Sequence, residues 1–242
     1  MKLDSDNCIG CELCPPYCPV NAIHMKNDVA VIDDDECVEC GVCFRSRVCP
    51  VDVFEEVVAP WPRAVRQVMS NPLIENPDTR IPGRGTEEVK TNEVTGRIKP
   101  GFVGMGLEMG RPGTGTRFTD VQKMTQGLAE VGVNFEPQNP VTLWMTDKKT
   151  GKIRDDILNE KSLSAIVEVS FPIDRLKAVL KKIDEVAQQI DTVFSITTCV
   201  KVLPDGSLPT DKIFQELGIT PYPGSKNNIG IGRPRFNFEE GA

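Results

Sequence analysis

"CVECGVCFRSRVCP", residues 37–50, and "CIGCELCPPYCP", residues 8–19, are the two cysteine runs that decide how the N-terminal part of this chain folds. The upstream run spaces its cysteines by two, two and three residues and then adds a proline. The downstream run begins with the same two spacings, but five residues stand before its last cysteine. Two runs with one rhythm indicate two similar binding loops.

The crowding of cysteines needs a chemical explanation. Eight of the nine cysteines lie between Cys8 and Cys49, and such crowding is typical of a disulfide framework, a zinc site or iron–sulfur ligation. A chain of 242 residues can bury a large core without disulfides. Structural zinc usually uses two separated Cys-x2-Cys pairs, whereas runs that end in Cys-Pro are typical of bacterial iron–sulfur proteins. The spacing therefore favours iron–sulfur clusters.

The stretches "DNCIGCELCPPYCPVNAI" (residues 6–23) and "DECVECGVCFRSRVCPVDVF" (residues 35–54) resemble the bacterial two-[4Fe–4S] ferredoxin family. The resemblance covers about residues 1–57 and implies that each run gives three ligands to one cluster and its last cysteine to the other. For cluster one it implies Cys8, Cys11, Cys14 and Cys49. For cluster two it implies Cys37, Cys40, Cys43 and Cys18. The longer spacer then lengthens the bridge between the clusters and leaves both triads unchanged.

The spacer of the second run also carries two cations, Arg45 and Arg47. A cation near an iron–sulfur cluster favours the reduced, more negative state, so we expect these arginines to raise the reduction potential of cluster two. Cys199, in the alternating stretch "ITTCVKV", is expected to be a buried core thiol. His24 is the only histidine, and we assign it no catalytic role.

Charge is distributed unevenly along the chain. Residues 1–57 hold four Lys and Arg against twelve Asp and Glu, a net charge of −8, and the rest carries +1. Phosphate binding needs clustered basic residues, and because residues 1–57 are acidic, we expect no nucleic-acid partner. A protein with a basic patch would instead be attracted to this acidic part of the chain. No signal region and no apolar stretch of the roughly 18 residues that a membrane span needs is present. We expect a soluble, cytoplasmic protein.

Residues 58–100 are expected to form an extended linker or docking arm, because prolines and glycines recur along them. One short helix is predicted at "PRAVRQVM", residues 62–69, with Pro62 at its first position. A segment of this length is expected to lie on a surface, either of this chain or of another subunit.

Residues 101–242 are predicted to form an α+β domain. Alternating apolar residues in "FVGMGLEM" (102–109) predict a strand, and helical spacing between Thr119 and Gly132 predicts a helix. The remaining predicted elements are strands at 141–145, 163–171 and 192–203, a helix at 174–189, and a short helix and a last strand near 210–217 and 229–231. This order predicts a split βαβ (ferredoxin-like) arrangement, an antiparallel sheet with two helices on one face.

Two features of this domain are candidates for ligand binding. Gly104, Gly106 and Gly110 are spaced to cradle a phosphate or a flavin, or else to let the backbone pack closely. Four arginines are candidates for holding one anionic group: Arg111, Arg117, Arg233 and Arg235.

A weaker resemblance covers about residues 83–236. The stretches "GRGTEEVKTNEVTGR", "GVNFEPQNPVT" and "NEKSLSAIVEVSFP" are similar to segments of 6-hydroxynicotinate reductase-type proteins, which are ferredoxin-dependent reducers of a heteroaromatic ring. The resemblance implies an anaerobic reductase setting. It rests on no catalytic motif, so it implies no catalytic residue.

Three functions remain open on these grounds. The first is an iron–sulfur electron-transfer subunit of an anaerobic oxidoreductase complex, with a flavin- or metal-containing catalytic partner. The second is a small ferredoxin-dependent reductase chain with a flavin or heteroaromatic-substrate site in the C-terminal domain, and the third is a redox sensor. A free electron carrier needs only a part such as residues 1–57. A C-terminal part about three times as large therefore favours the first function.

Overall fold

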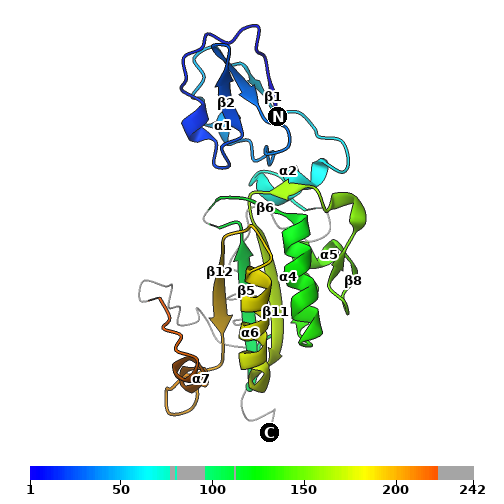
Figure 1. The fold of residues 1–242 in the computed structure, drawn as a ribbon, viewed down its shortest axis with the longest axis vertical. Helices are drawn as coiled ribbons and strands as arrows, with labels where there is room; N and C mark the ends of the chain where they lie inside the picture. The colour runs from blue at the N-terminus through cyan, green and yellow to red at the C-terminus, as the bar shows by residue number, and fades with distance from the viewer. Residues whose placement is uncertain (77–79, 81–95, 112, 223–242) are drawn as a thin grey trace.

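The computed structural model describes residues 1–76, 80, 96–111 and 113–222. It consists of a small head, residues 1–57, and a larger body, made by the described residues from 96 to 222 (Figure 1). Helix α2 (Ala64–Ser70) lies between the head and the body.

The head is built from two short antiparallel strand pairs, in which β1 pairs with β4 and β2 pairs with β3. Its elements are β1 (Lys2–Leu3), the 3₁₀ turn η1 (Pro15–Tyr17), β2 (Ile23–Lys26), β3 (Val29–Ile32), α1 (Val42–Arg45) and β4 (Phe54–Glu55). The core of the head is small, and cysteines are part of it. Its buried members are Met1, Cys14, Ile23, Ala30, Val53 and Phe54.

The two cysteine runs have the same backbone conformation at matching positions. Gly10 and Glu39 both stand two residues after the first cysteine of their run, and their φ angles are +67° and +57°. Glu12 and Gly41 also match, with φ angles of +60° and +69°. This left-handed region favours glycine, and each run places one glycine and one glutamate there. The head is therefore a pseudo-symmetric pair of loops.

The segment expected to be an extended linker or docking arm contains a packed helix. α2 covers nearly the same residues as the helix predicted at 62–69. Val65 and Met69 are buried in the core of the body, while Arg66 on the same helix bonds to the head. The described part of this segment is thus fixed to both parts of its own chain.

The body is built on a four-stranded antiparallel sheet. Its strands are β5 (Phe102–Met109), β7 (Asn134–Phe135), β11 (Ala165–Pro172) and β12 (Phe194–Cys199). They lie in the order β12-β5-β11-β7, so the first strand is central and the last is at an edge. β5 and β11 pair along their whole length, from Phe102 opposite Pro172 to Met109 opposite Ala165.

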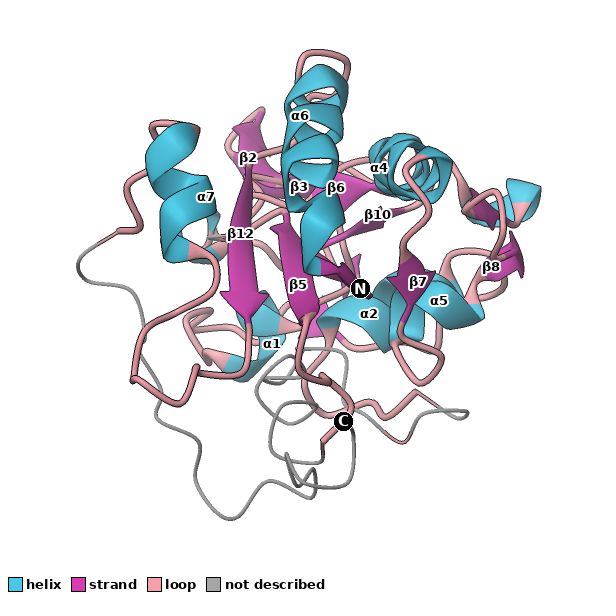
Figure 2. Ribbon diagram, turned by 90° about the horizontal axis from the view of Figure 1, so that it is seen from below, coloured by secondary structure: helices cyan, strands magenta, loops and turns pink. Residues whose placement is uncertain are grey.

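Helices α4 (Phe118–Glu130) and α6 (Leu176–Ala187) cover one face of this sheet (Figure 2). Every second residue of β5 is fully buried in the core that the helices close: Val103, Met105, Leu107 and Met109. Burying a side chain of this size stabilises the fold by roughly 1.5–3 kcal/mol. On the other face, a Cβ at Gly104 would lie 2.6 Å from Cδ1 of Ile98. Gly104 therefore lets Ile98 pack against the strand.

Residues 141–145 were expected to be a strand, and the structure corrects this. They form most of helix α5 (Pro140–Leu143) and the beginning of the next strand. Asn139 caps the helix, because its Oδ1 accepts a hydrogen bond of 2.8 Å from the backbone N–H of Val141. Pro140 occupies the first helical position, which it also favours.

Smaller elements complete the body. They are β6 (Thr116–Arg117), β8 (Met145–Asp147), β9 (Lys152–Ile153), η2 (Asp155–Ile157), β10 (Lys161–Ser162), η3 (Ile173–Arg175) and α7 (Asp211–Glu216). β8 pairs with β9 outside the main sheet, and β6 pairs with β10 on the side of the body that faces the head (Figure 1). The strand expected near 229–231 lies outside the described residues.

Candidate metal centres

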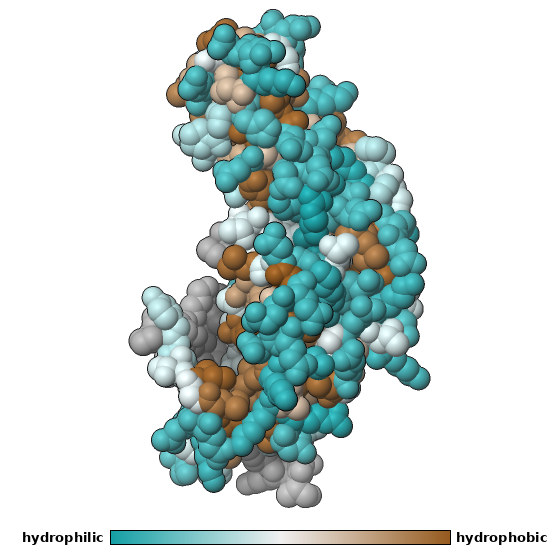
Figure 3. Space-filling view, in the orientation of Figure 1, coloured by the Kyte–Doolittle hydropathy of each residue, from teal (hydrophilic) through white to brown (hydrophobic). Residues whose placement is uncertain are grey.

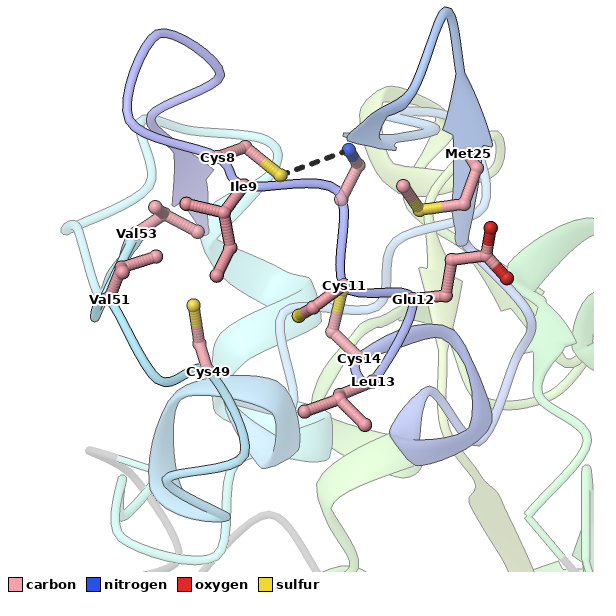
Figure 4. A pocket seen from close by; sticks show the side chains of 11 residues that line it. Cys8, Ile9, Cys11, Glu12, Leu13, Cys14, Met25, Cys49, Val51 and Val53 are labelled. Atoms are coloured by element: carbon pink, nitrogen blue, oxygen red, sulfur yellow. Dashed lines mark hydrogen bonds between the residues drawn. The ribbon is translucent and has the colours of Figure 1, made fainter.

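Four cysteines from both runs line one pocket of the head. They are Cys8, Cys11, Cys14 and Cys49. Figure 4 shows their side chains around one space, with apolar side chains from the first run and from the residues after the second run beside them. Among these apolar neighbours are Ile9, Leu13, Val51 and Val53. Three residues of the first run and the last cysteine of the second thus meet at one place.

A second pocket holds the other four cysteines of the head. They are Cys18, Cys37, Cys40 and Cys43, and the wall between them includes Val20, Ala22, Ile23 and Val38. The two groups of four are the same as the two ligand sets that the resemblance implies. The assignment of ligands stays a prediction, and the grouping makes it geometrically feasible.

Backbone N–H groups donate to two of the sulfurs. The N–H of Ala22 lies 3.1 Å from Sγ of Cys18, and the N–H of Ala30 lies 3.4 Å from Sγ of Cys8, the contact drawn in Figure 4. Hydrogen bonds to sulfur stabilise the thiolate and help to set the potential of an iron–sulfur cluster. Each pocket therefore contains an N–H donor suited to a charged sulfur.

Burial keeps several of these sulfurs protonated when no metal is bound. It raises the pKa of the Cys43 thiol to about 12, and it also raises the pKa of Cys14, Cys37 and Cys40 above the ordinary value. A metal ligand must be a thiolate, so metal binding here releases protons. The thiols are in this respect typical of ligands that are charged only when they hold a metal.

The donor sets consist of thiols alone and fit an iron–sulfur cluster. Among the residues that the structure describes, no group of three or more His, Cys, Asp or Glu side chains is arranged to hold one metal ion. Each pocket nevertheless has four thiols around an apolar space. A set of four thiols spread around such a space matches the all-cysteine ligation of a [4Fe–4S] cluster.

The five-residue spacer of the second run places its two arginines in different surroundings. Arg45 is the last residue of α1, and its Nη2 donates a hydrogen bond of 2.5 Å to the carbonyl of Cys40. Its Nη1 bonds to Oδ1 of Asn71, 3.1 Å away. Arg47 is exposed and lies over the ring of Phe44, 5.8 Å from its centroid. Of these two arginines, only Arg45 has a side chain that bonds to the loop of the second pocket.

A buried arginine joins the second pocket to the body. Nη1 of Arg66 donates to the carbonyls of Asp34, Asp35 and Cys37 at 3.0, 2.9 and 2.7 Å. Its Nε pairs with Glu160 of the body. Sequence reasoning missed this residue, and its position beside the apolar residues of the predicted helix was the only signal.

Two cations of the body bind acidic residues of the head. Nη2 of Arg117 lies 2.6 Å from Asp35 and 2.7 Å from Glu36, and Lys161 also pairs with Glu36. The hydrogen bond from Arg117 holds the pKa of Asp35 below its usual range. The acidic character of the head is thus partly used inside the chain.

The arginines expected to hold one anion do not converge where the structure describes them. Arg117 is engaged with the head, and Arg111 pairs with Glu108 at 3.1 Å. Arg233 and Arg235 lie outside the described residues. Because both described guanidinium groups already pair with carboxylates, the expectation of a shared anion site is wrong for them.

Two further residues can now be placed. Cys199 is half-buried at the end of the edge strand β12, so it is not the fully buried core thiol that was expected. His24 is exposed on β2.

Comparison with known proteins identifies the head. The family model described as "4Fe-4S dicluster domain" matches residues 7–53. Ferredoxin-2 of Chlorobaculum tepidum is 39% identical over 59 residues, which are 22% of this chain and 92% of that protein. Ferredoxin-1 of Rhodobacter capsulatus is 50% identical over 40 residues, 16% of this chain and 62% of that protein.

A larger relative matches over a short stretch of this chain. It is one of the subunits of the ion-translocating oxidoreductase complex of Methanosarcina acetivorans, 40% identical over 48 residues. The match spans 20% of this chain and only 17% of that relative, so it covers a small part of both proteins. No solved structure matches the chain. In the described residues, no helix is long and apolar enough to cross a membrane.

Proposed function

The chain belongs, through its head, to the ferredoxins with two [4Fe–4S] clusters, and from this premise we propose that it is the electron-transfer subunit of an oxidoreductase complex. It passes single electrons to or from a catalytic chain that holds a flavin or another metal centre. The observation that supports this most is the pair of four-cysteine pockets, each built from both runs.

The two pockets support the ligand roles that the resemblance implies. Cluster one would be held by Cys8, Cys11, Cys14 and Cys49, and cluster two by Cys18, Cys37, Cys40 and Cys43. Bound there, each cluster supplies one-electron redox chemistry. The protein contributes apolar walls to both pockets. It also contributes N–H donors at Cys8 and Cys18 that stabilise sulfur charge.

The body supports a role in a complex more than that of a free carrier. It is attached to the head through Arg66 of α2, which pairs with Glu160 of the body and donates to the carbonyls of Asp34 and Cys37 in the head. The sheet order β12-β5-β11-β7, with α4 and α6 joining its strands, supports a split βαβ fold for the body. A relative that matches the head is named as part of an oxidoreductase complex. We infer that the body gives the head a fixed position in such a complex.

The crossed ligand sets can be tested with single serine variants. The holoprotein should contain about eight iron and eight sulfide per chain, and Cys18→Ser or Cys49→Ser should reduce this to about four. Electron paramagnetic resonance of the reduced protein should then lose the signal of cluster two in Cys18→Ser and of cluster one in Cys49→Ser.

Cys199→Ser is the matched control, since Cys199 lies in the body and outside both pockets. It should keep the full iron and sulfide content. Full content in all three variants would refute the ligand assignment.

Membership in a complex needs a separate experiment. Anaerobic purification at low salt, followed by mass spectrometry of the chains that elute together, should yield a flavin- or metal-containing oxidoreductase chain in fixed ratio. Recovery of the chain alone with a full complement of clusters would instead support a free carrier.

A further inference from the structure

Matching positions around the two candidate clusters carry apolar side chains in both halves of the head. One residue follows the first cysteine of each run, one precedes the third cysteine, and one comes two residues after the last cysteine. In the first half these positions hold Ile9, Leu13 and Val51, and in the second Val38, Val42 and Val20. The pseudo-symmetry thus produces two equivalent apolar faces.

The body covers only one of these faces. Val38 and Val20 are 1% and 9% exposed, because they pack together with Leu163 of the body in one group of apolar residues. Their counterparts Ile9 and Val51 are 62% and 42% exposed. We name the exposed set of Ile9, Leu13 and Val51 the cluster-one face. Figure 3 shows hydrophobic residues at the surface of the head, at the upper end of the molecule.

The covered face shows which kinds of side chain bind an apolar face of the head. Leu163 supplies an apolar contact, and the cations around it pair with acidic residues of the head. Lys161 and Arg117 both bind Glu36. An apolar centre with a cationic rim is therefore the complement that the head already uses within its own chain.

The cluster-one face has the corresponding acidic rim. Glu12 lines the first pocket, and its carboxylate points away from the sulfurs in Figure 4. Asp28 lies beside Gly10, since a Cβ on that glycine would be 2.4 Å from the Asp28 carbonyl oxygen. Asp52 follows Val51, and all three acidic residues are exposed. Cys11, at the centre, is exposed as well, whereas its counterpart Cys40 is buried.

We propose that the cluster-one face docks a redox protein that presents an exposed apolar cofactor edge surrounded by lysine and arginine side chains. The inference rests on the proposed electron-transfer function and adds which cluster exchanges electrons with another protein. Cluster one exchanges electrons with the external partner, and cluster two faces the body. A second copy of this chain is the less suitable occupant, because its Leu163 is already covered by its own head.

The docking test uses a basic c-type cytochrome, which has lysines around an exposed haem edge, as the probe. The holoprotein is reduced, mixed with the oxidised cytochrome in a stopped-flow instrument, and followed by haem absorbance. The triple variant Glu12→Gln, Asp28→Asn, Asp52→Asn should transfer electrons about tenfold more slowly at low salt. The difference should disappear at about 0.5 M salt, where exposed charges are screened. All three residues have positive φ angles. Asparagine tolerates this conformation at positions 28 and 52, and glutamine at position 12 keeps the size and shape of the native glutamate.

The matched control is Asp174→Asn, Asp184→Asn, Asp211→Asn, which removes the same charge from exposed positions of the body. It should behave as the unmodified protein does. A second variant, Ile9→Ser with Leu13→Ser, should slow transfer several-fold at both salt concentrations, because its effect is not electrostatic.

The outcomes separate this inference from the proposed function. Equal rates in the rim variant and the control would overturn the docking face, while electron transfer by the unmodified protein would leave the proposed function intact. Absence of any transfer from a fully loaded protein would count against the function itself. Sedimentation velocity completes the test: a dimer that dissociates in the Ile9→Ser, Leu13→Ser variant would assign the face to a second copy and overturn the proposal.

Discussion

At the scale of single residues, two arginines that are equivalent in the sequence differ in the structure. Arg45 bonds to the carbonyl of Cys40 and lies 3.8 Å from Glu56, whereas Arg47 is exposed over Phe44. An exposed charge is screened by water and salt, and a half-buried one much less so. The effect expected of both arginines should therefore come from Arg45 alone.

The corresponding variant is Arg45→Ala. Loss of a cation beside the loop of cluster two should lower the reduction potential of that cluster by an amount on the order of tens of millivolts. An anaerobic redox titration followed by electron paramagnetic resonance measures both clusters. Arg47→Ala is the control and should leave both potentials within error. A larger shift in the control than in Arg45→Ala would contradict the electrostatic explanation.

Residues such as the cysteines could be predicted because their spacing is imposed by the chemistry of the ligand set. Arg66 could not, because its partners are carbonyls of residues 34–37 and a carboxylate at Glu160, which come together only after folding. Arg117 was misjudged for the same reason. A free guanidinium and one that pairs across an interface look alike in a sequence.

At the scale of elements, α2 is the piece that decides how the head is held. Its apolar residues are part of the core of the body, and its Arg66 satisfies three carbonyls of the second cysteine run and the residues before it. Removing one partner of a buried ion pair leaves the other charge uncompensated. The helix thus contributes more to the attachment of the head than its length suggests.

Arg66→Met should lower the free energy of unfolding by about 3 kcal/mol, because the Glu160 carboxylate and the carbonyls lose their donor. Urea unfolding of the holoprotein under anaerobic conditions measures this. Arg97→Met is the control, since Arg97 forms an exposed pair with Glu136 and should cost no more than about 1 kcal/mol. The double variant Arg66→Met, Glu160→Leu should recover part of the loss, and a strictly additive double variant would show that the pair is not coupled.

Long periodic elements of the body were predictable, and short ones were not. The strand at 102–109 and the helix after Thr119 have enough apolar repeats to decide between periods of 2 and 3.6. Residues 141–145 have too few repeats, and a capping bond from Asn139 outweighs the strand preference of their apolar side chains.

At the scale of the whole molecule, the head and the body depend on different sources of stability. The body has a continuous core between its sheet and its helices. The head has a core of six buried residues, one of which is a cysteine. Six more cysteines pack against this core or belong to the neighbouring group of packed apolar residues. A unit of this size usually needs a metal or a cross-link to fold stably.

Removal of iron and sulfide by a chelator should therefore unfold the head and leave the body folded. Hydrogen exchange followed by mass spectrometry should show loss of protection in β2 and β3, with β5, α4 and α6 still protected. Reconstitution with iron and sulfide should restore the protection. Uniform loss across both parts would show that the body, too, depends on the clusters.

The unequal covering of two equivalent faces has a consequence for how this chain can change under selection. A substitution at Val20 or Val38 must be matched by a change near Leu163, so that half of the head and the body are bound to evolve together. In the half around Ile9 and Val51, these exposed side chains have no such packing constraint from the described part of the chain. One half can be remodelled for a new redox partner while the other keeps its packing against the body.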